Sequence, residues 1–212
     1  TNEEQFLFGK LFLDGIGGGT VALQDATSAE GDVAFKSGLT IRADKAPNTR
    51  GAQEILPAVG VSLSTTEDLW KGIREGRIKG LILLGGNPIA KFSNSERDAL
   101  AGLDLLVVQD ILATEISQAA HVVLPGAAFI EKAGTFTNHA GRVQRLNAGL
   151  EPPGDARADW EILRDLSNAM GCEFAMEDVE SVMSEVASTV GSYGTVSRES
   201  VGSDGLQIEV AD

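Results

Sequence analysis

The middle of the chain alternates short apolar runs with segments in which apolar residues recur every three or four positions. The runs cover residues 81–84, 105–108 and 122–124. Short apolar runs ending in turn or polar residues predict buried strands of a parallel sheet. The segments between them predict helices. Residues 64–124 are therefore expected to form three helix–strand pairs with right-handed crossovers between parallel neighbours.

Capping signals mark the starts of several predicted helices. Ser64 with Glu67, and Ser93 with Glu96, have the spacing of a capping box, which predicts helices beginning at those serines. A short helix is expected over residues 114–120, before the last strand of the series. Further along, Asp159 is the expected cap of a helix over residues 158–170.

The two ends of the chain give weaker signals. Residues 3–13 predict a helix, and residues 15–19 are nearly all glycine and predict a turn. Residues 31–44 have weak strand character, and residues 47–51 predict a turn. Near the other end, the pattern predicts a last helix over residues 176–190 and a strand candidate over residues 206–210.

These elements predict an α/β fold. We expect a doubly wound, mostly parallel sheet with helices on both faces, and a small irregular or hairpin segment around residues 129–146. We divide the chain into three parts. These are an N-terminal helix and glycine-rich turn (1–20), the α/β domain (21–171), and a C-terminal helix and tail (172–212).

Composition narrows the kind of partner that the chain can have. Of the 212 residues, 42% are hydrophobic, which suffices for a proper core. The 17 Lys and Arg residues against 31 Asp and Glu residues give a net charge of −14, which disfavours nucleic acid. No apolar run approaches the roughly 20 residues that cross a bilayer, so direct membrane insertion is not expected. The acidic start without a Met predicts that the chain begins inside a longer protein.

Cysteine and histidine are scarce. Cys172 is the single cysteine, and His121 and His139 are the two histidines. One thiol cannot hold an iron–sulfur cluster, and two histidines are too few for a dedicated zinc cage. The sequence therefore predicts no catalytic residue, metal site or redox centre of the chain's own.

Candidate ligand residues follow two of the predicted strands. In open parallel sheets, ligands bind at the carboxyl ends of the strands. Glycines allow a backbone to approach a ligand closely, and a carboxylate can accept two hydrogen bonds from a guanine base or a ribose. An ordinary turn and a helix cap remain alternatives, because the full G-x-G-x-x-G pattern is absent. The candidate residues at these strand ends are Gly85, Gly86, Asn87, Pro88, Gln109 and Asp110.

A longer set of motifs resembles the molybdopterin oxidoreductases. The similarity extends over roughly residues 1–171 and is most specific over residues 109–163. The matching segments are Thr1 to Glu4, Asn48 with Gly51 and Ala52, Gly85 to Pro88, Val107 to Asp110, Thr114 with Glu115, Val122 to Pro125, Glu131 to Asn138, Gly141 to Gln144, Pro152 to Gly154, and Asp159 to Leu163.

Two branches of that family fit the motifs. One contains formate dehydrogenases and related enzymes, which bind a bis-molybdopterin guanine dinucleotide. The other is the large iron–sulfur subunit of NADH–quinone oxidoreductase (respiratory complex I). The forms of residues 46–52 and 134–142 look closest to the second branch, which the sequence therefore favours.

Two departures from the enzyme branch support that preference. Ile116 stands where the enzymes usually have Thr, and His121 stands where they usually have Asp. An apolar Ile116 pointing into the cleft would leave polar ligand groups unpaired, at a cost of about 1–3 kcal/mol. This predicts a vestigial cofactor cleft; the alternative is that both residues face elsewhere and say nothing about ligands.

The favoured resemblance implies a scaffolding role. The chain would support a subunit that passes electrons from NADH toward quinone through iron–sulfur clusters outside residues 1–212, with no cofactor of its own. Its partners would be the remaining lobes of its subunit and other peripheral-arm subunits of complex I, in the cytoplasm on the inner face of the cell membrane.

Two other functions stay open from the sequence. One is the guanine-dinucleotide-binding lobe of a molybdenum or tungsten enzyme, such as a formate dehydrogenase. There residues 85–88, Gln109, Asp110 and Thr114 would hold molybdopterin guanine dinucleotide. The other is an autonomous nucleotide-binding α/β domain.

Overall fold

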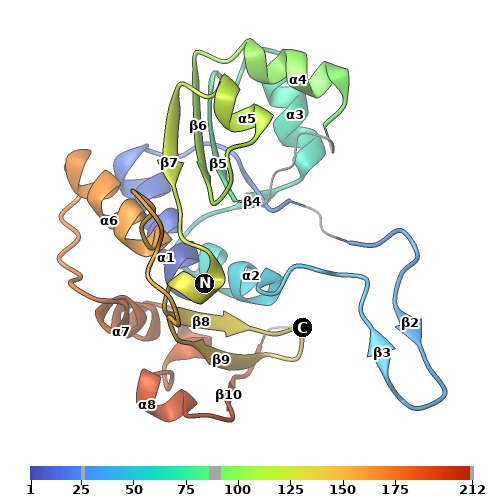
Figure 1. Ribbon diagram of the computed structural model, residues 1–212, viewed down its shortest axis with the longest axis vertical. Coiled ribbons are helices and arrows are strands. Elements are labelled where there is room, and N and C mark those ends of the chain that lie inside the picture. Colours follow the sequence, from blue (N-terminus) through green and yellow to red (C-terminus); the bar gives the residue numbers. More distant parts are fainter. Residues whose placement is uncertain (25–26, 86–91, 211–212) are drawn as a thin grey trace.

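The computed structural model describes residues 1–24, 27–85 and 92–210. The chain builds a parallel sheet with helices at one end of the molecule and an antiparallel sheet at the other (Figure 1). The first helices of the chain lie between the two sheets. This arrangement confirms the predicted α/β class with a parallel sheet.

The parallel sheet contains the three strands that the apolar runs predict. In the order β5–β6–β7, Leu81 pairs with Leu106, and Val107 pairs with Val122. The strands are β5 (Gly80–Leu84), β6 (Leu105–Asp110) and β7 (Val122–Pro125), and the helices between and before them are α3 (Thr66–Arg74), α4 (Asn94–Ala101) and α5 (Glu115–Ala119).

One hydrophobic cluster joins these helices to the sheet. Alternate side chains of β6, Leu106 and Val108, pack with Ile73 of α3, Leu100 of α4 and Ile116 of α5. On the opposite side of β6, Gln109 contacts α6. We call residues 66–125, which contain this cluster and the three strands, the parallel-sheet unit.

A second and larger core lies under the antiparallel sheet. Phe6 and Leu7 of the first helix pack in one cluster with Leu163, Val182 and Val186. The N-terminal and C-terminal segments therefore share a core. The helices and strands in this part of the molecule are α1 (Asn2–Lys10), β8 (Gly134–Thr137), β9 (Arg142–Leu146), α6 (Asp159–Ala169), α7 (Val179–Thr189), α8 (Arg198–Val201) and β10 (Leu206–Gln207), with short turns η3 (Phe129–Glu131) and η4 (Gly191–Tyr193).

The predicted hairpin at residues 129–146 is present as β8 and β9. Thr135 pairs with Arg145, and β10 adds to the outer edge of β9 through Leu206 and Val143. The strand candidate near the C-terminus thus belongs to this antiparallel sheet.

A third, smaller core surrounds helix α2 (Thr49–Ala58). Leu56 and Ala52 pack with Val21 and Val61, and the strands β1 (Val21–Ala22) and β4 (Leu63–Ser64) pair in parallel beside it. The first helix continues into a π-helical turn, η1 (Leu11–Gly15).

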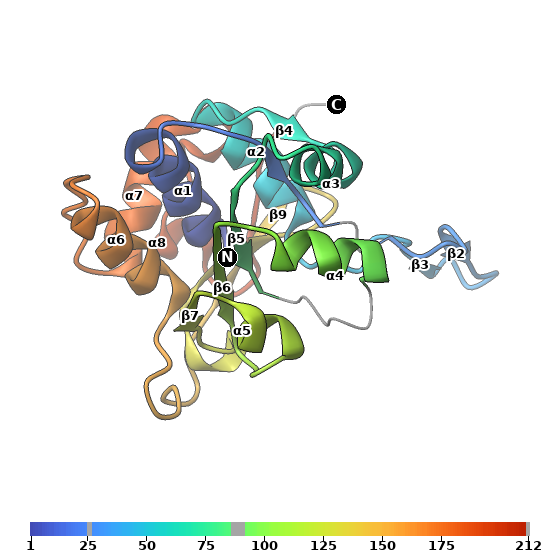
Figure 2. The same cartoon turned by 90° about the horizontal axis from the view of Figure 1, so that it is seen from above.

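A two-stranded hairpin extends away from the body of the molecule. It consists of β2 (Val33–Ala34) and β3 (Thr40–Ile41), and its projection is plain from above (Figure 2). Val33 pairs with Ile41, and both are exposed, at 38% and 47%. Isolated hairpins of this kind are marginally stable in water, so contacts with another surface would add to its stability.

Three local predictions are wrong. Ser64 ends β4, and the cap of α3 is Thr65, whose hydroxyl accepts from the Asp68 N–H. Residues 47–51 do not form a simple turn, because α2 already begins at Thr49. The N-cap of α6 is Ala158 rather than Asp159, since the Asp159 carboxylate is engaged with a buried lysine.

The other capping prediction is confirmed. Ser93 and Glu96 form a capping box at the start of α4. Across the described ranges, no helix has the length and apolar character that a membrane crossing needs.

Candidate functional site

The carboxyl edge of the parallel sheet brings three of the predicted ligand residues together. The Gly85 N–H donates to the Gln109 carbonyl at 2.7 Å, which extends the pairing of β5 with β6. Asp110 ends β6 and pairs with Pro125 of β7. Gly86, Asn87 and Pro88 lie outside the described residues.

Gly85 has a backbone conformation that favours glycine. Its φ is +63°, in the left-handed region that L side chains rarely adopt. The glycine that follows β5 is therefore required by the turn itself, and it keeps the backbone bare at the edge where a ligand would approach.

Asp110 offers a carboxylate at the same edge. It is half-buried, and its Oδ1 accepts the Ile111 N–H at 2.7 Å. No other described residue donates a hydrogen bond to this carboxylate. The turn bond that the sequence left as an alternative is thus real, but it leaves acceptor capacity for a ligand.

Gln109 faces the other way, toward helix α6. Its side chain is 2% exposed, and its Nε2 donates to the Asp159 carboxylate at 2.6 Å. The Gln109 Oε1 is buried without a hydrogen-bond partner in the described part of the chain. Because a carboxylate only accepts, the contact with Asp159 fixes which end of the amide is nitrogen.

Thr114 is the N-cap of α5. Its hydroxyl accepts the Ser117 N–H at 3.3 Å, and the Ser117 hydroxyl returns a bond to the Thr114 carbonyl. The structure therefore gives Thr114 a capping role, and its hydrogen-bond partner in the described residues is Ser117 rather than a residue at the strand ends.

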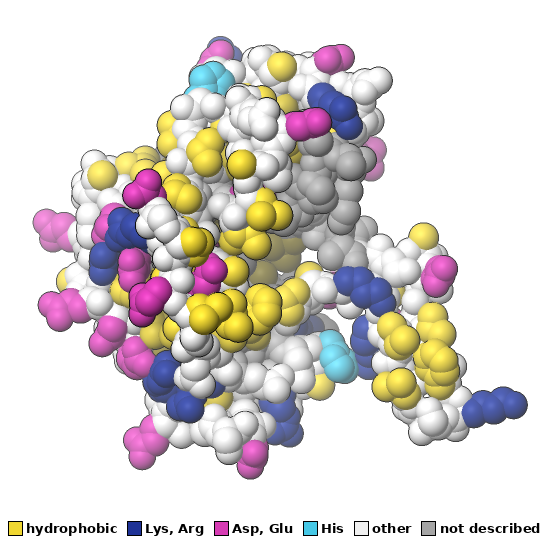
Figure 3. Space-filling view, in the orientation of Figure 1, with side chains coloured by type: hydrophobic (Ala, Val, Ile, Leu, Met, Phe, Trp, Pro, Cys, Tyr) yellow, Lys and Arg dark blue, Asp and Glu magenta, His cyan; other side chains and the backbone are white. Residues whose placement is uncertain are grey.

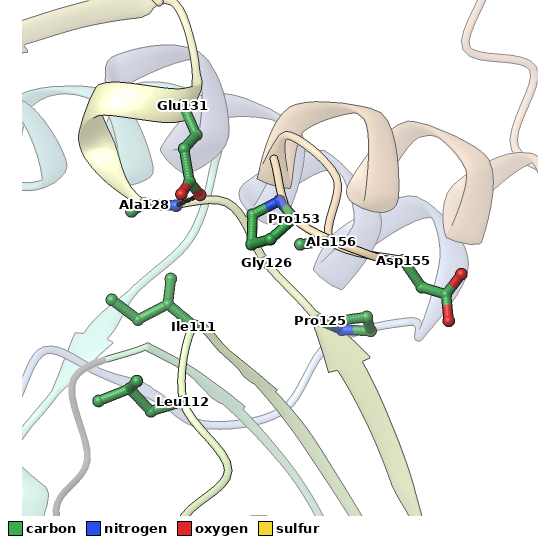
Figure 4. A pocket seen from close by; sticks show the side chains of 9 residues that line it. All are labelled: Ile111, Leu112, Pro125, Gly126, Ala128, Glu131, Pro153, Asp155 and Ala156. Atoms are coloured by element: carbon green, nitrogen blue, oxygen red, sulfur yellow. Dashed lines mark hydrogen bonds between the residues drawn. The ribbon is translucent and has the colours of Figure 1, made fainter. Parts of the chain in front are cut away.

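A hollow of about 470 Å³ lies beyond the ends of β6 and β7 (Figure 4). This volume is within the roughly 300–1,000 Å³ typical of small-molecule sites. Ile111 and Leu112 face it from the segment after β6, and Glu131 turns back to the Ala128 N–H. The lining residues are Ile111, Leu112, Pro125, Gly126, Ala128, Glu131, Pro153, Asp155 and Ala156.

Neither of the two departures from the enzyme pattern marks a degenerate cleft. Ile116 is 1% exposed and packs in the cluster beneath the sheet with Leu106 and Val108. The His121 Nδ1 accepts the Leu106 N–H at 2.9 Å, which supports the start of β7. Both residues serve packing and strand pairing, so they do not support the prediction of a vestigial cleft.

Several of the remaining motif residues meet in a buried polar cluster away from the sheet edge. Asn2 donates to the hydroxyls of Thr135 and Thr137, at 2.9 and 3.0 Å, and the Asn48 Oδ1 accepts the Thr137 N–H at 2.7 Å. The Tyr193 hydroxyl lies 2.5 Å from that of Thr137. These motif residues tie α1, α2 and β8 together.

A buried ionic group, which sequence reasoning missed, connects this region to the sheet. The Lys132 ammonium pairs with the carboxylates of Glu4, at 2.8 Å, and Asp159, with side-chain exposures of 11%, 13% and 18%. Burial disfavours the charged lysine, yet the two carboxylates raise the pKa of Lys132. Burial, together with nearby Glu4, raises the pKa of Asp159, while Lys132 opposes that shift. The only sequence signal was their presence in the family motifs.

No group of three or more His, Cys, Asp or Glu side chains suited to a metal ion occurs in the described ranges. What the geometry does define is the edge of a parallel α/β sheet that presents glycine, a carboxylate and a neighbouring hollow to a ligand. That is the place where nucleotides bind in this class of sheet.

The comparison with protein families identifies the chain. A model of the molybdopterin oxidoreductase family matches residues 15–169, and the chain therefore belongs to that family. The fold agrees: acetylene hydratase from Pelobacter acetylenicus superposes with a TM-score of 0.55 at 21% identity, over 72% of this chain and 22% of that one.

The similar proteins come from the enzyme branch. The NADPH-Fe(3+) oxidoreductase subunit alpha of Geobacter sulfurreducens is 44% identical over 137 residues, covering 62% of this chain and 16% of that protein. The F420-dependent formate dehydrogenase 1 subunit alpha of Methanococcus maripaludis is 41% identical over 134 residues, covering 61% and 20%. A putative formate dehydrogenase of Bacillus subtilis, YrhE, is 39% identical over 129 residues. The chain thus spans about a fifth or less of the length of these relatives.

These relatives overturn the branch that the motifs favoured. The expectation of a scaffolding domain in the large iron–sulfur subunit of complex I, with complex I partners, is wrong, because the similar proteins are formate dehydrogenase and NADPH-Fe(3+) oxidoreductase alpha subunits. The two departures that supported it lie in the packing of the sheet.

Proposed function

We propose that this chain supplies the nucleotide-holding lobe of a molybdenum or tungsten oxidoreductase of the formate dehydrogenase kind. Its ligand would be the guanine nucleotide part of a molybdopterin guanine dinucleotide. The observation that carries the proposal is the carboxyl edge of the parallel sheet, where Gly85 and the Asp110 carboxylate lie on neighbouring strands. The redox chemistry would come from the metal of the cofactor.

The residues present at this edge fit such a group. The Asp110 carboxylate keeps acceptor capacity beyond its single bond to Ile111, and guanine offers adjacent N–H donors. Gly85 has no side chain to obstruct the close approach of a ligand to the backbone. The residues of the chain would bind and orient the nucleotide.

Exposed apolar side chains support a place inside a larger subunit. Leu112, Phe129 and Leu150 are 68%, 66% and 60% exposed. Figure 3 shows hydrophobic side chains gathered across the middle of the molecule and on the β2–β3 hairpin. Exposed patches of this kind mark surfaces that contact other polypeptide. We propose that the remaining lobes of its own subunit, and partner subunits, cover them.

Replacing Asp110 with asparagine tests the proposed function. An amide presents one acceptor where the carboxylate presents two, so binding of GDP to the cofactor-depleted subunit should weaken about ten- to a hundredfold, since a bidentate contact to a base contributes about 1–3 kcal/mol. Calorimetric titration with GDP measures the change in Kd.

Asp104→Asn is the matched control. Asp104 is an exposed carboxylate immediately before β6, at the amino end of the same strand, so its loss removes one charge and leaves the proposed site intact. Equal Kd values for GDP in the wild type and Asp110→Asn, or no saturable binding by the wild type, would contradict the proposed function.

A further inference from the structure

The parallel-sheet unit has a hydrophobic core of its own. Among the described residues, its cluster, built around Leu106, Val108 and Ile116, shares no member with the core under the antiparallel sheet or with the core beside α2. Those two cores, in contrast, share Phe8 and Val59. We call the part of the molecule that contains the antiparallel-sheet core and the α2 core the helical body. Shared apolar residues join its two cores, whereas no apolar cluster of the described residues extends from it into the parallel-sheet unit.

Buried polar contacts connect the parallel-sheet unit to the helical body, and we call the region where they meet the joint. The Gln109 amide at the end of β6 donates to Asp159 at the start of α6, and Asp159 pairs with Lys132 between η3 and β8. Lys132 also pairs with Glu4 of α1 at 2.8 Å. Lys132 thus links α1 to α6, and Asp159 continues the connection to the end of β6.

The backbone at the joint is fitted closely around the Asp159 carboxylate. The Arg157 N–H donates to the Pro125 carbonyl, and the Gly126 N–H donates to the Asp110 carbonyl, both at 3.1 Å. A Cβ placed on Gly126 would lie 2.7 Å from the Asp159 Oδ1. The Asp159 carboxylate therefore lies against the backbone of Gly126, which is itself hydrogen-bonded to the Asp110 carbonyl.

The polar contacts at the joint depend on the positive charge of Lys132. Lys132 is the shared partner of two carboxylates, Glu4 and Asp159, in a setting where all three side chains are less than a fifth exposed. Without the lysine, Glu4 would keep its pair with the Thr1 ammonium at 2.5 Å, whereas the buried Asp159 carboxylate would lose its cation and keep only the bond from Gln109. A buried carboxylate left without its cation is strongly unfavourable. The Asp159 carboxylate could then take up a proton, draw in water or move away from Glu4.

We propose that Lys132 and Asp159 are positioning residues that, through Gln109, hold the carboxyl edge of the parallel sheet in the orientation that binds the nucleotide. Neither touches the ligand. This inference rests on the proposed function for the ligand, while the joint itself is independent of it.

The test replaces Lys132 with methionine in the intact subunit and follows amide hydrogen exchange. The Arg157 amide, which bonds across the joint to Pro125, and the Gly126 amide, which lies beside Asp159, should exchange at least about tenfold faster, because opening there no longer breaks an ion pair. The amides of Val108 and Val186, inside the two cores, should stay within about twofold of the wild type. GDP titration of the same variant should show a Kd raised by at least about tenfold.

Three further variants sharpen the result. Asp159→Asn keeps the shape and leaves Lys132 paired with Glu4, so it should show a smaller change of the same pattern and serves if Lys132→Met does not fold. Lys132→Arg should restore slow exchange. Asp165→Asn breaks the Arg157–Asp165 pair, whose side chains are 45% and 43% exposed, and should change neither exchange nor the Kd for GDP.

The outcomes separate this inference from the proposed function. Unchanged exchange at Gly126 and Arg157, or acceleration that is uniform over both cores, overturns the positioning role. Faster exchange at the joint with an unaltered Kd for GDP overturns its link to the nucleotide. A wild-type subunit that does not bind GDP overturns the proposed function instead. The exchange pattern then still tests whether Lys132 and Asp159 hold the parallel-sheet unit against the helical body.

Discussion

Replacing Gly51 with alanine is expected to lower the free energy of unfolding by about 3 kcal/mol or more, through overpacking and broken hydrogen bonds. Gly51 lies in the first turn of α2, and a Cβ there would stand 2.1 Å from the Asn2 Oδ1 and 2.4 Å from the Asn48 Oδ1. In a free helix, alanine would stabilise by about 1 kcal/mol over glycine. Here the clash outweighs that gain.

The two oxygens cannot easily move away. Asn2 is fully buried and donates to the hydroxyls of Thr135 and Thr137, and Asn48 accepts the Thr137 N–H at 2.7 Å. Making room for a methyl group would break bonds that no water can replace. The glycine in this motif is therefore explained by packing of polar side chains.

Denaturant unfolding of the variant measures the effect. Gly191→Ala is the control, because no atom lies within 4 Å of a Cβ at Gly191 among the described residues and its φ is not positive. This control should change the free energy of unfolding by less than about 1 kcal/mol. Two variants of equal stability would show that the polar cluster does not restrict Gly51.

The second large effect is a dependence of stability on pH that comes from Glu3. This side chain is 1% exposed, and burial raises its pKa from 4.5 to about 7, although a hydrogen bond from the Thr135 N–H at 2.9 Å opposes the shift. The folded protein thus binds this proton more tightly than the unfolded chain does.

The direction follows from proton linkage. Below pH 4.5 both states are protonated at Glu3, and its contribution to stability is at its maximum. As the pH rises from 4.5 to about 7, the unfolded state ionises first, and stability falls by up to about 3 kcal/mol. Above pH 7 the loss is complete and constant.

Glu3→Gln should remove this fall. The amide can still accept the Thr135 N–H and donate to the Thr135 hydroxyl, which lies 3.1 Å from the Glu3 carboxyl oxygen. The difference in unfolding free energy between variant and wild type should therefore grow from pH 4.5 to pH 7, with the variant more stable at the upper end.

Urea unfolding at a series of pH values measures that difference. Glu185→Gln removes one charge from an exposed position on α7 and controls for the change in net charge. A difference between Glu3→Gln and the wild type that stays constant across this range would show that folding does not raise the pKa of Glu3.

Local sequence determined the elements of the parallel sheet. The runs at residues 81–84, 105–108 and 122–124 appear as β5, β6 and β7 in the expected parallel order. Their apolar residues have no alternative to burial, and parallel pairing follows from the helices between them. The capping box of Ser93 and Glu96 was also readable, because both of its partners lie within one turn.

Local sequence failed where a side chain had a distant partner. Asp159 looks like a helix cap, but Lys132, 27 residues earlier, takes its carboxylate. Ile116 looks like a lost ligand contact, but it packs against strand residues of the core. Residues 47–51 look like a turn, but Asn48 meets Thr137 across 89 residues, and the helix starts there.

The sequence by itself therefore determined the fold class, the family motifs and the strand ends at which Gly85 and Asp110 lie, because hydrophobic periodicity and turn chemistry act over a few residues. Only the tertiary structure decided what the other motif residues do. Asn2, Gly51 and Lys132 serve packing and charge compensation between segments far apart in the chain. Such contacts depend on burial and on partners that spacing along the chain does not reveal.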